Sequence, residues 1–355
     1  MAFKKIIFNG SVFEHNGNYG IATFFSNMFN KISNDIDVTL WLGAESKFMF
    51  PKNIKIIRDD SRSYFKRFDI ISRIKKRFDK ASLNYRVYGF DIFHSVYDDF
   101  YNFAKINVCT VHDIIPELFY DQGSWALEQL IKKEILITKV NFITVPSEAT
   151  KCDFEKYYKK KVTAVIPHGH EHITNGFRKF DDLQNYFVYC GQRGSYKNFM
   201  VLAKAATLII KIIPNFKVSI IGPKFSIFEK RILDYLDVRR CFFEFGFVSD
   251  EMKFSIIGSS MGLIYPSLLE GFGFPILEGQ KLGVPVYMSD IPSSREVSGN
   301  IGVFFDPGNY FQLAEKIIQS YDIDNSSIVQ SGFENIKRYS WDLCGKKYLE
   351  FYYSL

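Results

Sequence analysis

Cysteine is scarce in this sequence, and it lacks the paired spacing that marks crosslinks or metal sites. Five Cys occur among 355 residues, and none belongs to a C-x-x-C pair. They are Cys109, Cys152, Cys190, Cys241 and Cys344. An odd and dispersed set excludes a disulfide framework and a cysteine zinc site, and it is typical of reduced thiols in a cytoplasmic protein.

Long apolar runs and metal-binding pairs are also missing. No run approaches the ~20 apolar residues of a transmembrane helix, and the stretch 6–8 is too short for a signal peptide. No D-x-D pair follows a predicted strand, and His168, His170 and His172 have no Cys or carboxylate cluster beside them. We therefore predict no metal site and a chain that is soluble or lies on a membrane surface.

The residues that are abundant favour two domains of mixed structure. Hydrophobic residues make up 47% of the 355, which is enough for large cores. Short apolar runs alternate with segments of helical periodicity, as in α/β proteins with parallel sheets. A polar stretch at 175–185 interrupts the alternation. We expect one domain at 1–175, completed by a C-terminal helix at about 340–355, and a second at 176–339.

Positive charge is concentrated in one stretch. The net charge is +6, and residues 61–87 hold nine Lys and Arg against two Asp, so their +7 leaves −1 for the rest. Apolar residues at helical spacing predict an amphipathic helix there. It is either a solvated face or a patch for an anionic membrane or a lipid-linked diphosphate. No nucleic-acid motif accompanies it, so we expect no nucleic acid partner.

The strongest local signal is the stretch 267–278, S-L-L-E-G-F-G-F-P-I-L-E. Apolar runs on both sides of it predict a strand, a glycine turn, a helix and a second strand. Gly271 and Gly273 let a ligand approach the backbone, and Pro275 suits the first position of a helix. The helix start offers N–H groups and a positive dipole end to a phosphate.

Charged residues accompany this turn and one other. Glu270 and Glu278 suit hydroxyls beside a phosphate, or they are only a solvated pair. Arg193 and Lys197 follow the predicted strand 187–190 and stand four positions apart. Two such cations can neutralise a diphosphate, with Arg as a bidentate fork and Lys as a point charge. The alternative is a pair of surface cations on a turn.

Two histidines and a glycine loop follow strands of the first domain. His112 ends the strand of N-V-C-T-V-H-D, and His94 has a similar position in F-D-I-F-H-S-V. A single His is more often a structural hydrogen-bonding group than a catalyst, so His94 is the weaker candidate, for the acceptor side. Gly17 and Gly20 follow the first strand, where open α/β sheets bind ligands.

Several of these motifs resemble one family, the retaining GT-B glycosyltransferases of the family 4 type. Glu270 and Glu278 match its E-x7-E signature, and P-S-L-L-E-G-F-G-F-P-I-L-E is similar to it nearly letter for letter. The resemblance implies that Glu270 contacts the donor sugar's hydroxyls and that Glu278 binds the ribose of the nucleotide. It also implies donor contacts from the residues between them, which are Gly271, Phe272, Gly273, Phe274 and Pro275.

Further motifs carry the same resemblance. The run Y-C-G-Q-R-G-S-Y-K-N resembles the family's diphosphate clamp, which implies donor binding by Gly191, Arg193 and Lys197. T-V-H-D-I-I-P-E resembles the histidine motif that approaches the donor sugar near its 6-position, which gives His112 that role. The turn at Val248 resembles the turn whose backbone contacts the nucleobase in that family. The loop of Gly17 and Gly20 resembles the glycine loop beside the acceptor and the donor phosphates.

The resemblance implies a GT-B fold, in which two Rossmann-like doubly wound domains face each other across a cleft. The implied reaction is metal-independent transfer of a hexose, with retention, from a nucleotide sugar to a glycan hydroxyl. R-G-S-Y-K-N resembles mannosyltransferases of surface-polysaccharide assembly, so we expect mannose or a related hexose and favour a GDP-sugar over a UDP-sugar. No other cofactor is expected.

The acceptor expected for such an enzyme is a lipid-linked polysaccharide or O-antigen intermediate. This would place the protein in the cytoplasm, peripheral at the inner face of the cytoplasmic membrane through residues 61–87. A nucleotide-sugar epimerase or a non-catalytic nucleotide-sugar-binding protein on the same fold is the alternative. The basic stretch favours the transferase, because an epimerase needs no acceptor site.

Overall fold

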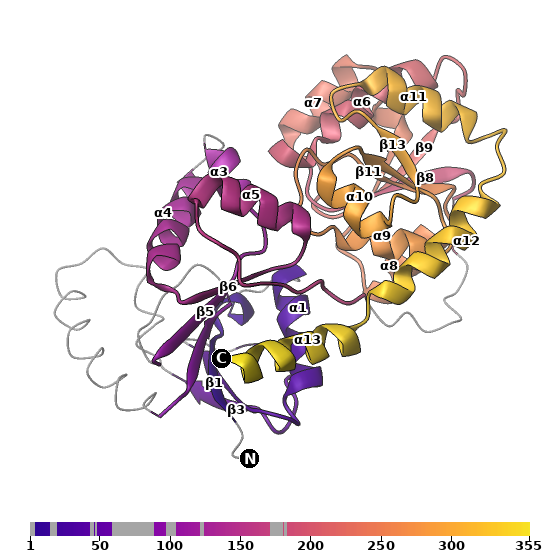
Figure 1. The fold of residues 1–355 in the computed structure, drawn as a ribbon. Helices are drawn as coiled ribbons and strands as arrows, with labels where there is room; N and C mark the ends of the chain where they lie inside the picture. Colours follow the sequence, from indigo (N-terminus) through magenta and orange to yellow (C-terminus); the bar gives the residue numbers. More distant parts are fainter. Residues whose placement is uncertain are drawn as a thin grey trace. The chain divides into compact units, whose positions relative to one another are not determined.

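The computed structural model describes residues 4–14, 20–42, 46, 48–58, 89–96, 104–120, 124–170, 180 and 183–355. The basic stretch 61–87, Gly17 and His172 lie outside these ranges. The chain divides into two compact units (Figure 1). The first unit is Met1–Gly169 with Trp341–Leu355, and the second is His170–Ser340.

The first unit is built on a parallel sheet with the strand order β3-β2-β1-β4-β5-β6-β7. The strands are β1 Lys5–Asn9, β2 Asp37–Leu42, β3 Lys55–Arg58, β4 Ile92–Ser95, β5 Ile106–Thr110, β6 Phe142–Val145 and β7 Ala164–Val165. The helices are η1 Ser11–Phe13, α1 Gly20–Ile32, α3 Ile115–Leu118, α4 Ser124–Lys139, α5 Glu148–Tyr158 and α13 Trp341–Ser354. Central strands such as β1 and β4 are apolar and buried, as expected when both faces of a sheet are covered.

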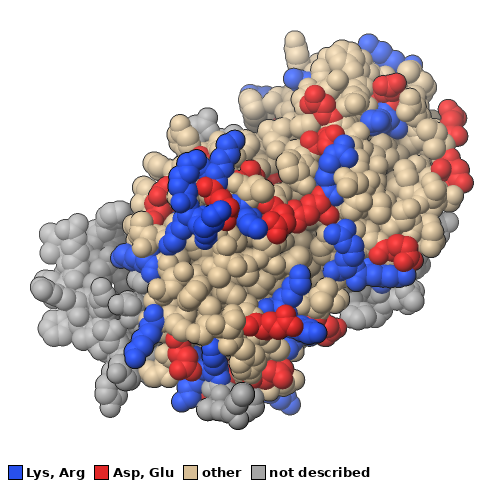
Figure 2. Space-filling view, viewed as in Figure 1, with Lys and Arg blue, Asp and Glu red and all other residues tan. Residues whose placement is uncertain are grey.

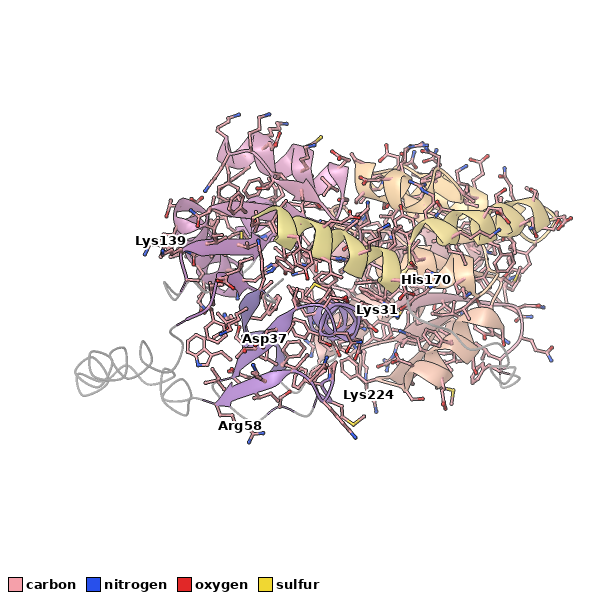
Figure 3. All side chains as sticks on the ribbon, turned by 60° about the horizontal axis from the view of Figure 1, so that its bottom comes forward. Lys31, Asp37, Arg58, Lys139, His170 and Lys224 are labelled. Atoms are coloured by element: carbon pink, nitrogen blue, oxygen red, sulfur yellow. The ribbon has the colours of Figure 1, made fainter. Side chains whose placement is uncertain are left out.

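Helices cover both faces of this sheet (Figure 1). The connection from β1 to β2 runs towards one edge of the sheet, and the connection from β6 to β7 runs towards the opposite edge. Because both crossovers are right-handed, their helices α1 and α5 lie on opposite faces of the sheet. On the α1 face, Phe29 packs edge-on against Phe8 of β1 with 4.8 Å between ring centroids. Helix α13 packs against α1 there (Figure 3). Lys31 of α1 forms an ion pair of 2.7 Å with Asp342 of α13.

A buried polar cluster attaches α13 to the first sheet. His94 Nδ1 lies 2.6 Å from the Tyr352 hydroxyl, and His94 Nε2 lies 2.9 Å from Thr110 Oγ1. The His94 side chain is fully buried, so both ring nitrogens are used inside the unit. The prediction that His94 lines an acceptor site is therefore wrong, because the C-terminal helix covers it.

The second unit has a parallel sheet with the order β10-β9-β8-β11-β12-β13. Its strands are β8 Tyr186–Cys190, β9 Lys217–Ile221, β10 Phe242–Gly246, β11 Gly262–Tyr265, β12 Val286–Ser289 and β13 Val303–Phe305. Its helices are η4 Ser195–Lys197, α6 Phe199–Ile209, α7 Ile227–Tyr235, η5 Arg239–Cys241, α8 Asp250–Gly258, α9 Phe274–Lys281, α10 Pro292–Ser298, α11 Tyr310–Gln319, α12 Ser326–Asn335 and η6 Ile336–Arg338.

Strand β8 separates the two cores of this unit. Phe187 and Tyr189 belong to the cluster formed with α6 and α11, whereas Tyr186 and Val188 belong to the one formed with α8 and α9. This alternation follows from the two-residue period of a strand. Both units are thus Rossmann-like and doubly wound, which confirms the predicted fold class.

The surface of the described residues carries mixed charge. Figure 2 shows a group of Lys and Arg side chains over α3–α5 of the first unit, with acidic side chains among them. Some of these charges are paired, as in Lys151 with Glu148 and Lys161 with Glu155. Among the described helices, none is long and apolar enough to cross a bilayer.

Candidate active site

The strand order of the second sheet reverses between β8 and β11. Open α/β sheets bind ligands outside the carboxyl ends of the strands at such a point. The predicted Arg/Lys stretch follows β8, and the stretch of Glu270 and Glu278 follows β11. The Leu268 N–H donates to the Tyr196 carbonyl over 2.7 Å, which joins the two loops.

The turn after β11 leads directly into α9. Gly273 has φ +100°, and a Cβ on it would lie 3.2 Å from Ile276 Cδ1 and 3.4 Å from Tyr265 Cε1. A side chain would therefore be both strained and crowded at this position. The N-cap of α9 is Gly273, which has no side chain to form a cap, and Pro275 stands in the first turn. The backbone N–H groups at this helix start suit an anionic ligand.

Glu270 forms an ion pair with Lys197 in this turn. Lys197 Nζ lies 2.6 Å from Glu270 Oε1, and the two side chains are 20% and 11% exposed. Burial, and then the Glu270 charge, raise the pKa of Tyr265 well above its usual value. A neutral phenol and a charged pair therefore line the carboxyl end of β11.

Glu278 forms a second ion pair, with a lysine that the sequence analysis did not identify. Lys253 Nζ on α8 lies 2.9 Å from Glu278 Oε1 and 3.2 Å from Asp250 Oδ1. Burial lowers the pKa of Lys253, but the charge of Glu278, together with the smaller effects of Cys190, the Glu278 hydrogen bond and Asp250, outweighs burial, so the net shift of the pKa is upward. Burial and the Glu278 charge raise the pKa of the nearby Cys190 thiol to about 12. Lys253 thus remains charged, and Cys190 remains neutral.

Arg193 lies beside the turn after β9. Its guanidinium pairs with Glu229 over 2.7 Å and also donates to the carbonyls of Pro223 and Lys224. It stacks 4.4 Å from the ring centroid of Phe225. The Arg193 side chain is only 4% exposed, so a diphosphate would have to replace these partners to engage it. Its role in the clamp stays a prediction.

In the first unit, His112 follows β5. Its Nε2 atom is buried and has no hydrogen-bond partner among the described residues, while the ring's other nitrogen bonds the backbone of Val96. Burial lowers the pKa of His112 to about 3; the hydrogen bond to Val96 opposes this shift, and the charge of Lys133 adds a smaller lowering. The imidazole is therefore neutral, and its Nε2 is an acceptor that lacks a donor.

A buried ion pair supports the His112 turn, and the sequence analysis also missed it. Lys133 on α4 lies 3.0 Å from Glu117 Oε1 and donates to the Asp113 carbonyl over 2.9 Å. The Tyr158 hydroxyl donates to the same Glu117 oxygen over 2.7 Å. Lys133 and Glu117 are almost fully buried. The network ties α3, α4 and α5 to the residue that follows His112.

The other predicted residues are distributed over both units. Gly191 has φ +127° and its N–H donates to the Ile221 carbonyl over 2.8 Å. Val248 lies in the turn before α8 and packs partly buried against the core. Gly20 begins α1 in the first unit. Among the residues that the structure covers, no group of three or more His, Cys, Asp or Glu could hold a metal ion.

Comparisons with known proteins agree with this geometry. Residues 175–327 match the family "Glycosyl transferases group 1". Over 101 residues the chain is 36% identical to O-antigen chain mannosyltransferase B of Escherichia coli, which is 28% of this chain and 26% of that protein. Over 95 residues it is 32% identical to O-antigen chain mannosyltransferase RfbU of Salmonella typhimurium, which is 25% and 27% of the two chains. The chain thus matches about a quarter of the length of these relatives.

Solved structures are similar over nearly the whole chain. A sucrose-phosphate synthase from Thermosynechococcus elongatus superposes with a TM-score of 0.75 at 15% identity, over 99% of this chain and 98% of its own. WaaG, a glycosyltransferase involved in lipopolysaccharide biosynthesis, superposes with 0.73 at 13% identity, over 98% and 99%. At these identities the similarity concerns the fold, and it confirms the GT-B fold that the sequence predicts.

Proposed function

We propose that the protein is a retaining hexosyltransferase of the family 4 type. The premise is the match of residues 175–327 to the family "Glycosyl transferases group 1". The enzyme would move mannose or a related hexose from a nucleotide sugar, with a GDP-sugar favoured, to a hydroxyl of a glycan. The similarity to two O-antigen chain mannosyltransferases supports this donor sugar and a lipid-linked acceptor.

The observation that carries the proposal is the pairing of both signature carboxylates at the switch point of the second sheet. Glu270 and Glu278 each form an ion pair with a lysine there, beside the start of α9. Hydroxyl-binding carboxylates on both sides of a phosphate-binding helix start suit a sugar, a diphosphate and a ribose in succession. We assign Glu270 to the sugar and Glu278 to the ribose.

The reaction breaks the bond between the anomeric carbon and the diphosphate oxygen. The acceptor oxygen forms its bond on the same face, and its proton passes to the departing phosphate. Negative charge grows on the diphosphate, where Lys197 and the α9 N–H groups stabilise it without a metal. A chelator such as EDTA should accordingly leave turnover unchanged.

His112 supports sugar binding in this scheme. A buried acceptor without a donor costs about 1–3 kcal/mol, and Nε2 of His112 is such an atom among the described residues. A sugar hydroxyl that donates to it would remove this cost. We therefore assign His112 to a hydroxyl of the donor sugar.

The first test is thermal-shift titration of the protein with GDP and UDP. We expect GDP to raise the melting temperature more than UDP, and Glu278→Gln to weaken the effect. Glu334→Gln is the matched control, because Glu334 also pairs with a lysine but lies exposed on α12. A shift with UDP and none with GDP would overturn the donor assignment. No shift with either would contradict nucleotide binding.

Peripheral binding to the inner face of the cytoplasmic membrane is part of the proposal. It rests on the +7 charge of residues 61–87, because each Lys or Arg near an anionic surface gains about 1 kcal/mol. The variant with Lys75, Lys76, Arg77 and Lys80 changed to Ser should no longer sediment with anionic vesicles and should still bind nucleotide. If the wild type does not sediment with such vesicles at ~50 mM salt, residues 61–87 have no role in membrane binding.

A further inference from the structure

Lys253 has no role in the scheme above, although it lies beside one of the two signature carboxylates. It stands on α8, four residues after the N-cap Ser249, while Glu278 stands on α9. The Lys253 and Glu278 side chains are 17% and 12% exposed, and 2.9 Å separates Nζ from Oε1. The pair therefore joins two neighbouring helices at the carboxyl end of the sheet.

The Glu278 side chain has a single polar partner among the described residues. Within the part of the chain that the structure describes, Lys253 provides the only hydrogen bond and the only ion pair of this carboxylate, and both reach Oε1. Because each carboxylate oxygen accepts more than one hydrogen bond, Oε2 keeps its full capacity. A mostly buried carboxylate is costly without a cation, so Lys253 offsets the cost of burying Glu278 and leaves Oε2 as the oxygen with capacity for further hydrogen bonds.

Lys253 itself is held in place from three sides. Asp250 Oδ1 lies 3.2 Å from its Nζ, and the Phe254 ring centroid lies 4.8 Å away. Asp250 is 71% exposed and contributes little as an isolated surface pair. The cation is thus directed at Glu278, and its charge offsets the repulsion between that carboxylate and an incoming diphosphate.

We propose that Lys253 is a positioning residue, which orients Glu278 so that its second oxygen accepts hydrogen bonds from the vicinal hydroxyls of the donor's ribose. The inference rests on the proposed function, since it assumes a nucleotide at this site. Lys253 acts through Glu278 and needs no contact with the nucleotide.

The test is calorimetric titration with GDP, or with UDP where UDP binds more tightly, and with the 2′,3′-dideoxy analogue of the same nucleotide. In the wild type, loss of the ribose hydroxyls should weaken binding roughly 10- to 100-fold, because hydrogen bonds to a charged group are lost. In Lys253→Met this difference should shrink to within about 3-fold, because the carboxylate is no longer oriented. Lys253→Arg should restore most of it.

The matched control is Lys230→Met, since Lys230 faces Glu244 at 3.9 Å on another part of the unit. It should keep the wild-type difference between the two nucleotides. If Lys253→Met does not fold, Lys253→Gln replaces it and should show an intermediate difference. A Lys253 variant that folds and keeps the full effect of the ribose hydroxyls would overturn the inference and leave the proposed function intact. A wild type that binds neither GDP nor UDP would overturn both.

Discussion

Lys197 and Glu270 are 73 positions apart in the chain, yet their charged groups lie 2.6 Å from each other. The contact brings the predicted diphosphate clamp and the predicted sugar-binding carboxylate into one site. Without a ligand, the Lys197 ammonium and the Glu270 carboxylate neutralise each other's charge. A donor that binds there would take over both, with its diphosphate replacing Glu270 at Lys197 and its sugar hydroxyls replacing Lys197 at Glu270.

Lys197→Ala should lower turnover about 100- to 1000-fold, which corresponds to the loss of one preorganised charge contact to the transition state. Turnover with the nucleotide sugar measures this loss, and the melting temperature shows whether the variant remains folded. Lys204→Ala is the control, because Lys204 is exposed on α6 in the same unit. Near-normal turnover of the Lys197 variant would mean that the phosphates lie elsewhere.

Arg193→Ala should destabilise the second unit, because the guanidinium is buried against Glu229, Pro223 and Lys224. Loss of hydrogen bonds to a charged group costs about 1.5–3 kcal/mol each, so the melting temperature should fall by several degrees. Glu229→Gln removes the ion pair without removing Arg193 and should show a smaller fall. If Arg193→Ala keeps its melting temperature but loses nucleotide binding, the guanidinium belongs to the diphosphate clamp after all.

Acid should destabilise the first unit. Burial lowers the pKa of His94 and His112 to about 3 and that of His168 well below 6.5. The folded state therefore keeps these rings neutral, whereas the unfolded chain binds protons below pH 6.5. Their stabilising effect is complete above pH 6.5 and is lost as the pH falls. For His94 and His112 the loss is about 2 kcal/mol each by pH 5. Thermal unfolding at pH 7.5 and pH 5.0 measures it.

A variant isolates this effect from other groups that titrate in the same range. His94→Gln has no ring to protonate, so its melting temperature should fall less between the two pH values than that of the wild type. An equal fall in both proteins would mean that His94 does not titrate on unfolding as expected.

Lys133→Met should both destabilise the first unit and weaken donor turnover. It leaves the Glu117 carboxylate buried without its cation, which costs about 3–5 kcal/mol, and it removes the donor to the Asp113 carbonyl. The double variant with Glu117→Gln should recover part of the stability, because it removes the unpaired charge. If turnover stays normal in the folded single variant, the network does not position His112.

The sequence was sufficient for the fold and for one part of the candidate site. Strands such as β8 and β11 are apolar and end in glycine or proline turns, so their positions and parallel pairing follow from local pattern. The turn before α9 was also predictable from local pattern, because a glycine followed two positions later by a proline is typical of a turn that leads into a helix. Gly273 is the N-cap of α9, and Pro275 is its second residue, one position later than expected.

Partners chosen by tertiary packing were not predictable. Lys253 and Glu278 meet only because α8 packs beside α9, and Lys133 meets Glu117 only because α4 returns across α3. Arg193 was expected to face a phosphate. Its partner Glu229 lies 36 positions away, and no sequence pattern near either residue predicts that they pair. His94 was misassigned because the covering residue, Tyr352, lies 258 positions later.

Sugar transfer tests the central claim most directly. The purified protein would be incubated with GDP-[¹⁴C]mannose and a lipid-linked glycan acceptor, and the label in the lipid extract would be compared with the GDP released. The account predicts that label enters the glycan in an amount equal to the GDP and that Glu270→Gln reduces both. Conversion of the donor into another nucleotide sugar without GDP release, or no transfer from GDP- and UDP-sugars alike, would contradict it.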